Sequence, residues 1–391
     1  MFFILLGVAL GIAAGFIPGF NSNNLSLVLI AYGFISSNYY LAVTVVSVEI
    51  SSSFFEFMSP MIFGIGNEAT SLAITSMPDE LTEENFKRSI RTVISGGLVG
   101  ILISLPLLFL ADRIYPLVYS SLQPLVGWIL LFLCVYMVWI EKSWRKKFFA
   151  AAIFCLSGVF GLLVKSGGLI SSEYLLLPVF IGLYGFSSII SKRHEKTEID
   201  YLQETAWGER ARPAAIGFIT SVFASLISGM KRGQTSALAM QIGGVSRREE
   251  VLFMLPMISL AFVTLSIFAL GSAGKIRSYL AYDIQEVMGE LYFSQTVLLT
   301  GTVVISACVS ACLLIVLAKP IGKFFSKINK KWLEIFGFCI GSLLIMIFTG
   351  AAGAMLAFTA TCIGVLSSRL GIRSTHLMGV LLLPSIVLMI S

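Results

Sequence analysis

Residues 11–30 read GIAAGFIPGFNSNNLSLVLI, and this stretch decides how the rest of the chain is interpreted. An apolar run stops at Pro18 and Gly19, passes through a polar segment at residues 21–24, and resumes at Leu25. Neither arm reaches the roughly 20 apolar residues that a helix needs to cross a bilayer. Inside a membrane such a break is tolerated only where protein or a cavity surrounds it, and it is typical of transporter binding sites. We therefore predict a re-entrant hairpin that turns at Pro18 and Gly19.

A second broken segment lies at residues 221–240, SVFASLISGMKRGQTSALAM. Gly229 aligns with Gly19 at an offset of 210 (229 − 19), and the same offset aligns Ser236 with Ser26. Two broken segments at corresponding positions of two halves are typical of an internally duplicated carrier. We predict that the second hairpin turns at Gly229.

The composition places the chain in a lipid bilayer. Its 391 residues are 57% hydrophobic and 12% charged, with a mean hydropathy of +0.92. Because soluble domains carry about 25% charged residues, we predict an all-α, multi-pass protein of the cell membrane. The net charge of +6 comes largely from Lys and Arg in short loops between apolar runs, where they set orientation, so it does not indicate nucleic-acid binding.

Ten apolar runs are predicted to form full spans, five in each half. A first repeat is expected over residues 1–190, a cytoplasmic linker over 191–212, and a second repeat over 213–391. Two interrupted segments, 59–77 and 275–290, follow the first span of each half. The predicted spans are residues 39–58, 92–111, 117–140, 148–164, 174–190, 251–270, 292–318, 333–349, 351–367 and 375–390.

Loop charges indicate that the two halves cross the membrane in opposite senses. The basic loop at residues 142–147 is expected in the cytoplasm, because positive loops stay on that side. The basic loop at 319–331 is expected there too, although it corresponds to the loop at 112–116, which the same count of spans places outside. Each half therefore holds an odd number of spans, about five, and the fold is predicted to be an inverted repeat.

Four stretches together resemble a known transporter family. They are GFIPGFNSNN at 15–24, EISSSFFEF at 49–57 leading to NEATSL at 67–72, LLLPVFIGLYG at 175–185 and HLMGVLLLP at 376–384. In this order, and over nearly the whole chain, they resemble the archaeal branch of the TctA family, the membrane subunit of tripartite tricarboxylate transporters. The resemblance implies import of carboxylate anions driven by a cation gradient. It also implies an extracytoplasmic binding protein and a small membrane subunit as partners.

The chain departs from the family pattern at both hairpin tips. The second tip of such proteins typically reads Pro-Gly-x-Gly, whereas residues 228–233 read SGMKRG. The first tip usually carries a His where this chain has Asn21. Both departures lie at the predicted site, so a citrate-like specificity does not carry over from the resemblance.

The hairpin tips are the predicted substrate site, because the free N–H groups and partial positive charge of helix N-termini attract anions. The polar side chains of the first tip can hydrogen-bond carboxylate or phosphate oxygens, and those of 22–24 can equally act as helix caps. At the second tip Lys231 and Arg232 are the sharper signal, since a charge deep in a membrane costs roughly 2.5–3.5 kcal/mol on insertion scales. The alternative is that both cations are solvated in a vestibule. The predicted substrate-binding residues are Asn21, Ser22, Asn23, Asn24, Lys231, Arg232, Gly233, Gln234, Thr235 and Ser236.

A coupling-ion site is predicted on the first full span. Glu49, Ser52, Ser53 and Glu56 are spaced three, four and seven residues apart, so they share one helical face. Two carboxylates with hydroxyls between them suit Na⁺, or a proton if burial favours the neutral acid. The alternative for Glu56 is a hydrated position near the cytoplasmic end. Glu68, in the broken segment that follows, is a further candidate for this ion.

Asp283, Glu286 and Glu290 also share a face, but they adjoin Lys275 and Arg277. This pattern indicates an amphipathic helix at the membrane surface.

No cofactor and no metal other than Na⁺ is expected. The six cysteines all lie in apolar runs, and the only histidines are His194 and His376, so neither a zinc nor a haem set is complete. No catalytic residue arrangement is evident, so we do not expect an enzyme.

We therefore predict a secondary transporter of small organic anions, driven by a Na⁺ or H⁺ gradient. A carrier of polyprenyl phosphate or another lipid anion on the same fold is the nearest alternative, and an intramembrane enzyme is a weaker one. The sequence leaves a homodimer open.

Overall fold

A computed structural model describes most of the chain. The described residues are 1–17, 22–32, 35, 37–76, 82–122, 125–168, 170–171, 174–191, 207–227, 230–245, 247–274, 276 and 278–390. Every regular element in these ranges is a helix. Five of the helices are long and apolar enough to cross a membrane. The prediction of an all-helical, multi-pass membrane protein is confirmed.

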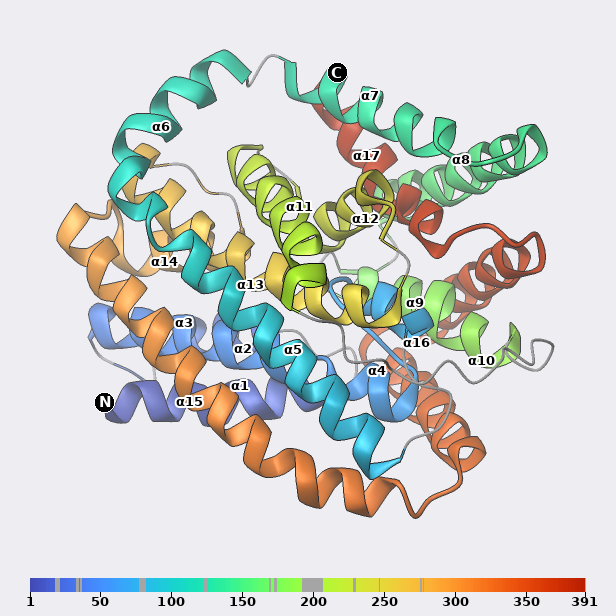
Figure 1. Ribbon diagram of the computed structural model, residues 1–391, viewed down its shortest axis with the longest axis horizontal. Helices are drawn as coiled ribbons and strands as arrows, with labels where there is room; N and C mark the ends of the chain where they lie inside the picture. Colours follow the sequence, from blue (N-terminus) through green and yellow to red (C-terminus); the bar gives the residue numbers. More distant parts are fainter. Residues whose placement is uncertain are drawn as a thin grey trace.

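Two buried helices form the centre of the molecule (Figure 1). They are α3 (Asn38–Phe55), which is followed directly by α4 (Met58–Phe63), and α13 (Arg248–Ala273). The most apolar 18-residue stretch of each is buried completely by its neighbours.

The helix α1 (Phe2–Phe16) packs on α3 through a stripe of glycines. A Cβ atom added at Gly7, Gly11 or Gly15 would lie only 2.5–2.7 Å from a main-chain oxygen of α3. Small residues four apart allow two helix backbones to approach closely, which is how helices associate where lipid removes the hydrophobic drive. Side chains at this stripe would force α1 and α3 apart.

The central helix of each half, α3 or α13, packs against helices of its own half and against helices of the other half. In each half the helix before the hairpin break packs on the second helix after the break, α1 on α3 and α11 (Trp207–Leu226) on α13. From the first half, α5 (Glu83–Ser104) packs on α13, and from the second half α15 (Phe293–Phe325) packs on α3. Figure 1 shows α5 and α15 side by side. The opposite orientation of the two halves stays a prediction.

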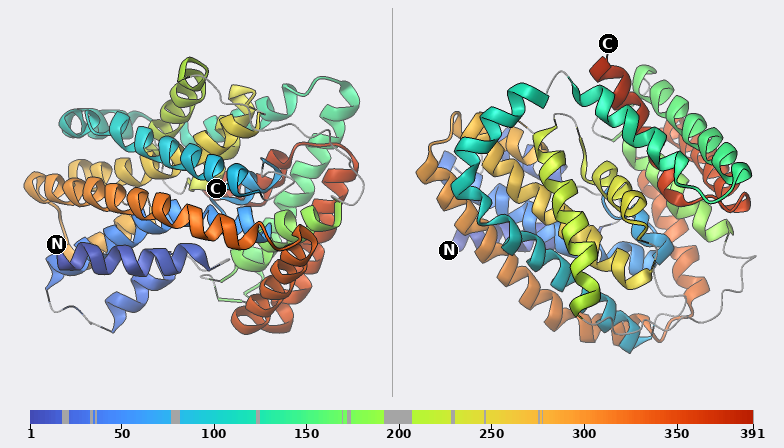
Figure 2. Two further views of the ribbon diagram at one scale, coloured as in Figure 1. Left: turned by 60° about the horizontal axis from the view of Figure 1, so that its bottom comes forward. Right: turned by 45° about the horizontal axis from the view of Figure 1, so that its top comes forward.

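The remaining helices form a second group, at the upper and right-hand side of Figure 1. Figure 2 shows the same separation from two other directions. Three elements lie between the groups and contact both: α4, η1 (Ser71–Ser76) and α12 (Arg232–Gly243). The members of the second group are α7 (Val126–Trp139), α8 (Trp144–Ser166), α9 (Leu176–Phe180), η3 (Ile181–Phe186), α10 (Ser187–Ser191), α16 (Lys330–Arg369), η4 (Ser374–Met378) and α17 (Gly379–Ile390).

Some predicted boundaries were wrong. The run 92–111 is not one helix, because α5 ends at Ser104 and α6 (Leu107–Leu122) begins after Pro106. Proline lacks the backbone N–H that a helix interior needs, and its ring clashes with the carbonyl of the preceding turn. Consequently the first part of the predicted span 117–140 belongs to α6. The predicted loop 319–331 begins too early, since α15 continues to Phe325.

The break predicted between 349 and 351 is present. The 40-residue α16 is interrupted at Gly350, whose φ of 62° and ψ of −156° are not helical. In the linker region, α10 ends at Ser191 and α11 begins at Trp207, so the last part of the predicted linker is helical.

Both predicted hairpins coincide with interruptions between helices. The first helix ends at Phe16, and α2 (Ser22–Ala31) begins six residues later (22 − 16). In the second half α11 ends at Leu226 and α12 begins at Arg232. The predicted turn residues Pro18, Gly19 and Gly229, and the predicted ligand Asn21, lie outside the described residues.

Candidate functional site

The first residue of α12, Arg232, inserts its guanidinium among the polar side chains of α3. Its Nη1 atom lies 3.1 Å from Oε1 of Glu49 and 3.8 Å from Oε1 of Glu56, and it donates a hydrogen bond of 3.0 Å to Oγ of Ser53. These three residues lie on one face of the end of α3, as their spacing predicted. Glu49 and Glu56 are only 4% and 6% exposed, so these charges are paired away from water.

The same carboxylate also receives the start of the other broken segment. Ser22, the first residue of α2, donates a short hydrogen bond to Oε2 of Glu49. Glu49 therefore connects the N-terminus of α2 with that of α12, although the two helices are about 200 residues apart in the chain. The N-termini of α2 and α12 thus meet on a residue that the sequence analysis proposed for the coupling ion.

Glu56 is fixed from the opposite side by Asn67. The side-chain amide of Asn67 donates a hydrogen bond of 2.8 Å to Oε2 of Glu56. Its side-chain oxygen, Oδ1, accepts from the backbone N–H groups of Ala69 and Thr70. The other oxygen, Oε1 of Glu56, is buried and has no hydrogen-bond donor among the described residues. The alternative of a simply hydrated Glu56 is wrong. We call Ser22, Glu49, Ser53, Glu56, Asn67 and Arg232 the Arg232 cluster.

Lys231 forms a second ion pair beside this cluster. Its ammonium lies 3.6 Å from Oε2 of Glu68 and 5.6 Å from the centre of the Tyr279 ring. The turn that carries Glu68 approaches α12 very closely, because a Cβ atom added at Gly233 would lie 2.5 Å from the main-chain oxygen of Glu68. Only glycine fits this approach. The prediction that the broken segment at 59–77 contributes to the site is consistent with these contacts.

The charges at the site almost balance. With all groups ionised, Lys231 and Arg232 face Glu49, Glu56 and Glu68, which gives a net charge of −1 (2 − 3). Removing one partner from a buried ion pair costs about 3–5 kcal/mol, because the other charge is left uncompensated. The cations predicted to bind an anion are thus already paired with the carboxylates predicted to bind a cation.

Several predicted site residues have other roles in the structure. Ser52 donates to the main-chain oxygen of Glu49, and Thr235 to that of Lys231, so both hydroxyls bond to their own helix region. Gln234 accepts from the backbone N–H of Lys231 and donates to Ser385 of α17, with distances of 2.8 and 2.9 Å. The hydroxyl of Ser236 is buried without a partner in the described part of the chain. Asn23 and Asn24 are partly buried on α2.

Asp283 was not predicted to be buried. It lies on α14 (Tyr279–Met288), which packs against α3 and α2, and it is 3% exposed while Glu286 and Glu290 are exposed. The amphipathic pattern had indicated that the three acidic residues share one face at the membrane surface. In the structure they have different environments, because Asp283 is buried and the other two are exposed. Burial, together with repulsion by Glu49 and Glu286, raises the pKa of Asp283 to about 7. The helix α14 is not among the candidate membrane spans.

A second buried polar cluster lies at the other end of α12, and no sequence motif indicated it. Glu141, after α7, lies 3.1 Å from Nε2 of the fully buried His376 and 3.5 Å from Nε2 of Gln241 on α12. Thr375 donates 2.9 Å to Oε1 of Gln241. We call these four residues the Glu141 cluster. The glutamate is hidden in a basic loop sequence, and only its burial distinguishes it.

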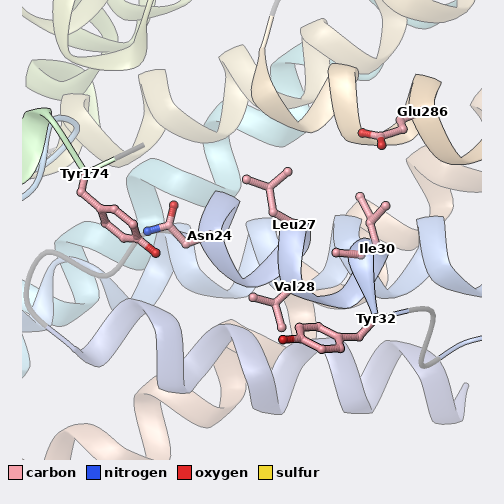
Figure 3. A pocket seen from close by; sticks show the side chains of 8 residues that line it. Asn24, Leu27, Val28, Ile30, Tyr32, Tyr174 and Glu286 are labelled. Carbon is pink, nitrogen blue, oxygen red and sulfur yellow. The ribbon is translucent and has the colours of Figure 1, made fainter. Parts of the chain in front are cut away.

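A pocket lies next to α2 and not at the Arg232 cluster (Figure 3). Its volume is about 330 Å³, and its walls are mainly apolar side chains of α2 together with Tyr32 and Tyr174. Asn24 is a predicted substrate residue that lines it, and Glu286 supplies a carboxylate. The described lining residues include no cation, so they do not by themselves suit an anion.

No group of three His, Cys, Asp or Glu side chains within the described ranges is placed to hold a metal ion. All six cysteines are free, and five of them are exposed.

Comparison with known proteins identifies the family. The model of the "Tripartite tricarboxylate transporter TctA family" matches residues 1–379. The chain belongs to the TctA family. This is a transporter family, and its membership does not favour the lipid-anion carrier or the enzyme that the sequence left as alternatives.

The TctA match covers every residue of the Arg232 and Glu141 clusters. Among curated proteins, the chain is 25% identical to an uncharacterized protein of Methanocaldococcus jannaschii over 407 residues, which cover 99% of this chain and 98% of that relative. No solved structure matches the chain. One of the four stretches that resemble the TctA family, 49–57 leading to 67–72, carries Glu49, Ser53, Glu56 and Asn67 of the Arg232 cluster.

Proposed function

We propose that this TctA protein is a secondary transporter of small organic anions, and that its substrate binds between the N-termini of α2 and α12. The observation that carries the proposal is the meeting of Ser22 and Arg232 on the buried carboxylate of Glu49. Two helix N-termini from the two halves thereby face one enclosed polar position. Both offer backbone N–H groups and positive partial charge to an anion.

Arg232 is the group we expect to recognise the anion. A guanidinium presents its N–H donors in a fixed fork that matches a carboxylate, and it binds one at present, that of Glu49. A substrate carboxylate can bind the guanidinium with the same geometry once Arg232 separates from Glu49. Lys231 provides a second positive charge on the preceding residue, which suits a substrate with more than one carboxylate.

The charge balance favours symport with a cation. The site already has a net charge of −1 with all groups ionised, so a carboxylate that enters alone adds like charge to a poorly solvated region. A Na⁺ ion or a proton that enters with the anion removes this penalty. The oxygens of Glu49, Ser53 and Glu56 are our candidates to receive it, with Ser52 and Glu68 nearby.

An inverted repeat is our proposed architecture, with residues 191–212 in the cytoplasm and the chain in the cell membrane. The reciprocal packing of α5 on α13 and of α15 on α3 supports it, because a twofold relation between halves exchanges partners in this way. Transport would then move the group around α3 and α13 against the group around α8 and α17.

Partners follow from the family, whose members belong to tripartite systems with a binding protein and a small membrane subunit. We propose that an extracytoplasmic binding protein delivers the anion to this chain.

The experiment is uptake of labelled di- and tricarboxylates into proteoliposomes that contain the purified protein, with and without an inward Na⁺ or H⁺ gradient. We expect uptake that depends on one of the two gradients. We also expect that replacing Lys231 and Arg232 together by Gln abolishes the thermal stabilisation that a transported carboxylate gives. A protein that folds and takes up no carboxylate under either gradient, with or without added partner subunits, would refute the proposal. Arg88→Gln is the control, because Arg88 pairs with the buried Glu249 at 3.2 Å, outside the site.

A further inference from the structure

The Arg232 guanidinium occupies a position that has the chemistry of a cation site. Its Nη1 atom contacts two carboxylates and a hydroxyl, at 3.1, 3.8 and 3.0 Å. All three oxygens come from α3, whereas the guanidinium comes from α12, a different element. Without the arginine, the oxygens of Glu49, Ser53 and Glu56 would form a buried, oxygen-only set, which is what hard cations prefer.

A second observation shows that Arg232 does not satisfy this set completely. Oε1 of Glu56 is buried and accepts no hydrogen bond from any described residue, and the guanidinium is 3.8 Å away, beyond hydrogen-bond distance. The other oxygens are already supported, since Ser22 donates to Glu49 and Asn67 donates to Glu56. The carboxylates are therefore held in place by groups other than the arginine, and one buried oxygen lacks a close partner.

We propose that Glu49, Ser53 and Glu56 form a Na⁺ site that Arg232 occupies as a tethered cation while no substrate is bound. The inference deepens the proposed function, because it states what regulates the cation site. A substrate anion takes the guanidinium away from Glu49 and Glu56. The two buried carboxylates then lack a counter-charge, and Na⁺ replaces the arginine.

This exchange makes the two ligands dependent on each other. Na⁺ alone must compete with a cation that is covalently attached to the protein, so it binds weakly. The anion alone would leave two buried carboxylates unpaired, so it also binds weakly. Each ligand strengthens the binding of the other by the same factor, as linkage requires.

The test measures Na⁺ binding without any anion. Purified wild-type protein and Arg232→Gln are titrated with NaCl against choline chloride at constant ionic strength, and the melting temperature is recorded. We expect no Na⁺-specific shift for wild type below about 100 mM, and a saturable shift for Arg232→Gln, with an apparent Na⁺ affinity at least tenfold higher. The double variant Arg232→Gln with Glu49→Gln should lose the gain. Arg88→Gln, which removes a partly buried arginine from the buried Glu249, should show no gain in Na⁺ affinity.

A folded Arg232→Gln that does not respond to Na⁺, or that responds equally with Glu49→Gln added, would overturn the inference. So would a response to pH in place of Na⁺. Arg232→Lys is the second variant if Arg232→Gln does not fold. Because the lysine side chain is shorter than that of arginine, its ammonium should approach the three oxygens less closely. Arg232→Lys should therefore bind Na⁺ more tightly than wild type does, and equal affinity would count against the proposal. The increase in Na⁺ affinity is measured without any transported anion. Its failure can therefore be distinguished from a failure of the uptake assay.

Discussion

Gly233→Ala tests the geometry of the site without changing any charge. The added Cβ atom would lie 2.5 Å from the main-chain oxygen of Glu68, whereas ordinary van der Waals contact begins at 3.4 Å. The tip of α12 must therefore move by about 0.9 Å (3.4 − 2.5) relative to this turn. If the movement is directed away from α3, the Arg232–Glu49 distance grows from 3.1 Å to about 4.0 Å, the outer limit of an ion pair.

We expect Gly233→Ala to lower the free energy of unfolding by about 1–3 kcal/mol, the usual cost of overpacking a tight contact. Gradient-driven uptake should fall with it, because the guanidinium no longer meets its partners. Thermal unfolding in detergent and uptake into proteoliposomes measure the two effects. Gly301→Ala is the matched control, since Gly301 lies on α15 with no atom within 4 Å of the added Cβ. Equal stability and equal uptake for the two variants would show that α12 does not press on this turn.

Three further predictions concern other parts of the molecule. Asp283→Asn should be more stable than wild type at pH 8, by up to about 4 kcal/mol, because a pKa raised from 3.8 to about 7 means that ionisation opposes folding. Wild-type stability should fall as pH rises from 4 to 7, and the two proteins should converge near pH 4, as urea titrations at several pH values would reveal. Gly11→Leu should separate α1 from α3 and lower the melting temperature, whereas Gly301→Leu should not. Gly350→Ala should destabilise by about 1–3 kcal/mol, because only glycine readily adopts φ 62° and ψ −156°, and calorimetry that finds no loss would contradict this reasoning.

The broken helices and the acidic face of α3 could be predicted from the sequence, because both follow from local patterns. Pro18 and the polar residues after it interrupt an apolar run, and the spacing of Glu49, Ser53 and Glu56 alone places them on one face. The interruption between 349 and 351 was likewise visible, because Gly350 separates two runs of span length.

The partners of these residues could not be predicted. Arg232 is 183 residues from Glu49 (232 − 49), and no local pattern indicates that an arginine expected to bind an anion is already neutralised. Asp283 was misjudged for a similar reason, because an amphipathic period says which residues share a face but not which helix covers it. The pair of Glu141 and His376 joins two loops whose sequences look like ordinary membrane-surface segments.

The helix α12 is attached at both ends to different parts of the molecule. Its first residue binds α3 through Arg232, and near its last turn Gln241 bonds to Thr375 and to the main-chain oxygen of Met137 in the second group of helices. A sliding movement between the two groups cannot preserve both attachments, so buried polar contacts must break before new ones form. The activation enthalpy of turnover should therefore be large, and it should drop in Gln241→Ala even though Gln241 lies outside the proposed substrate site.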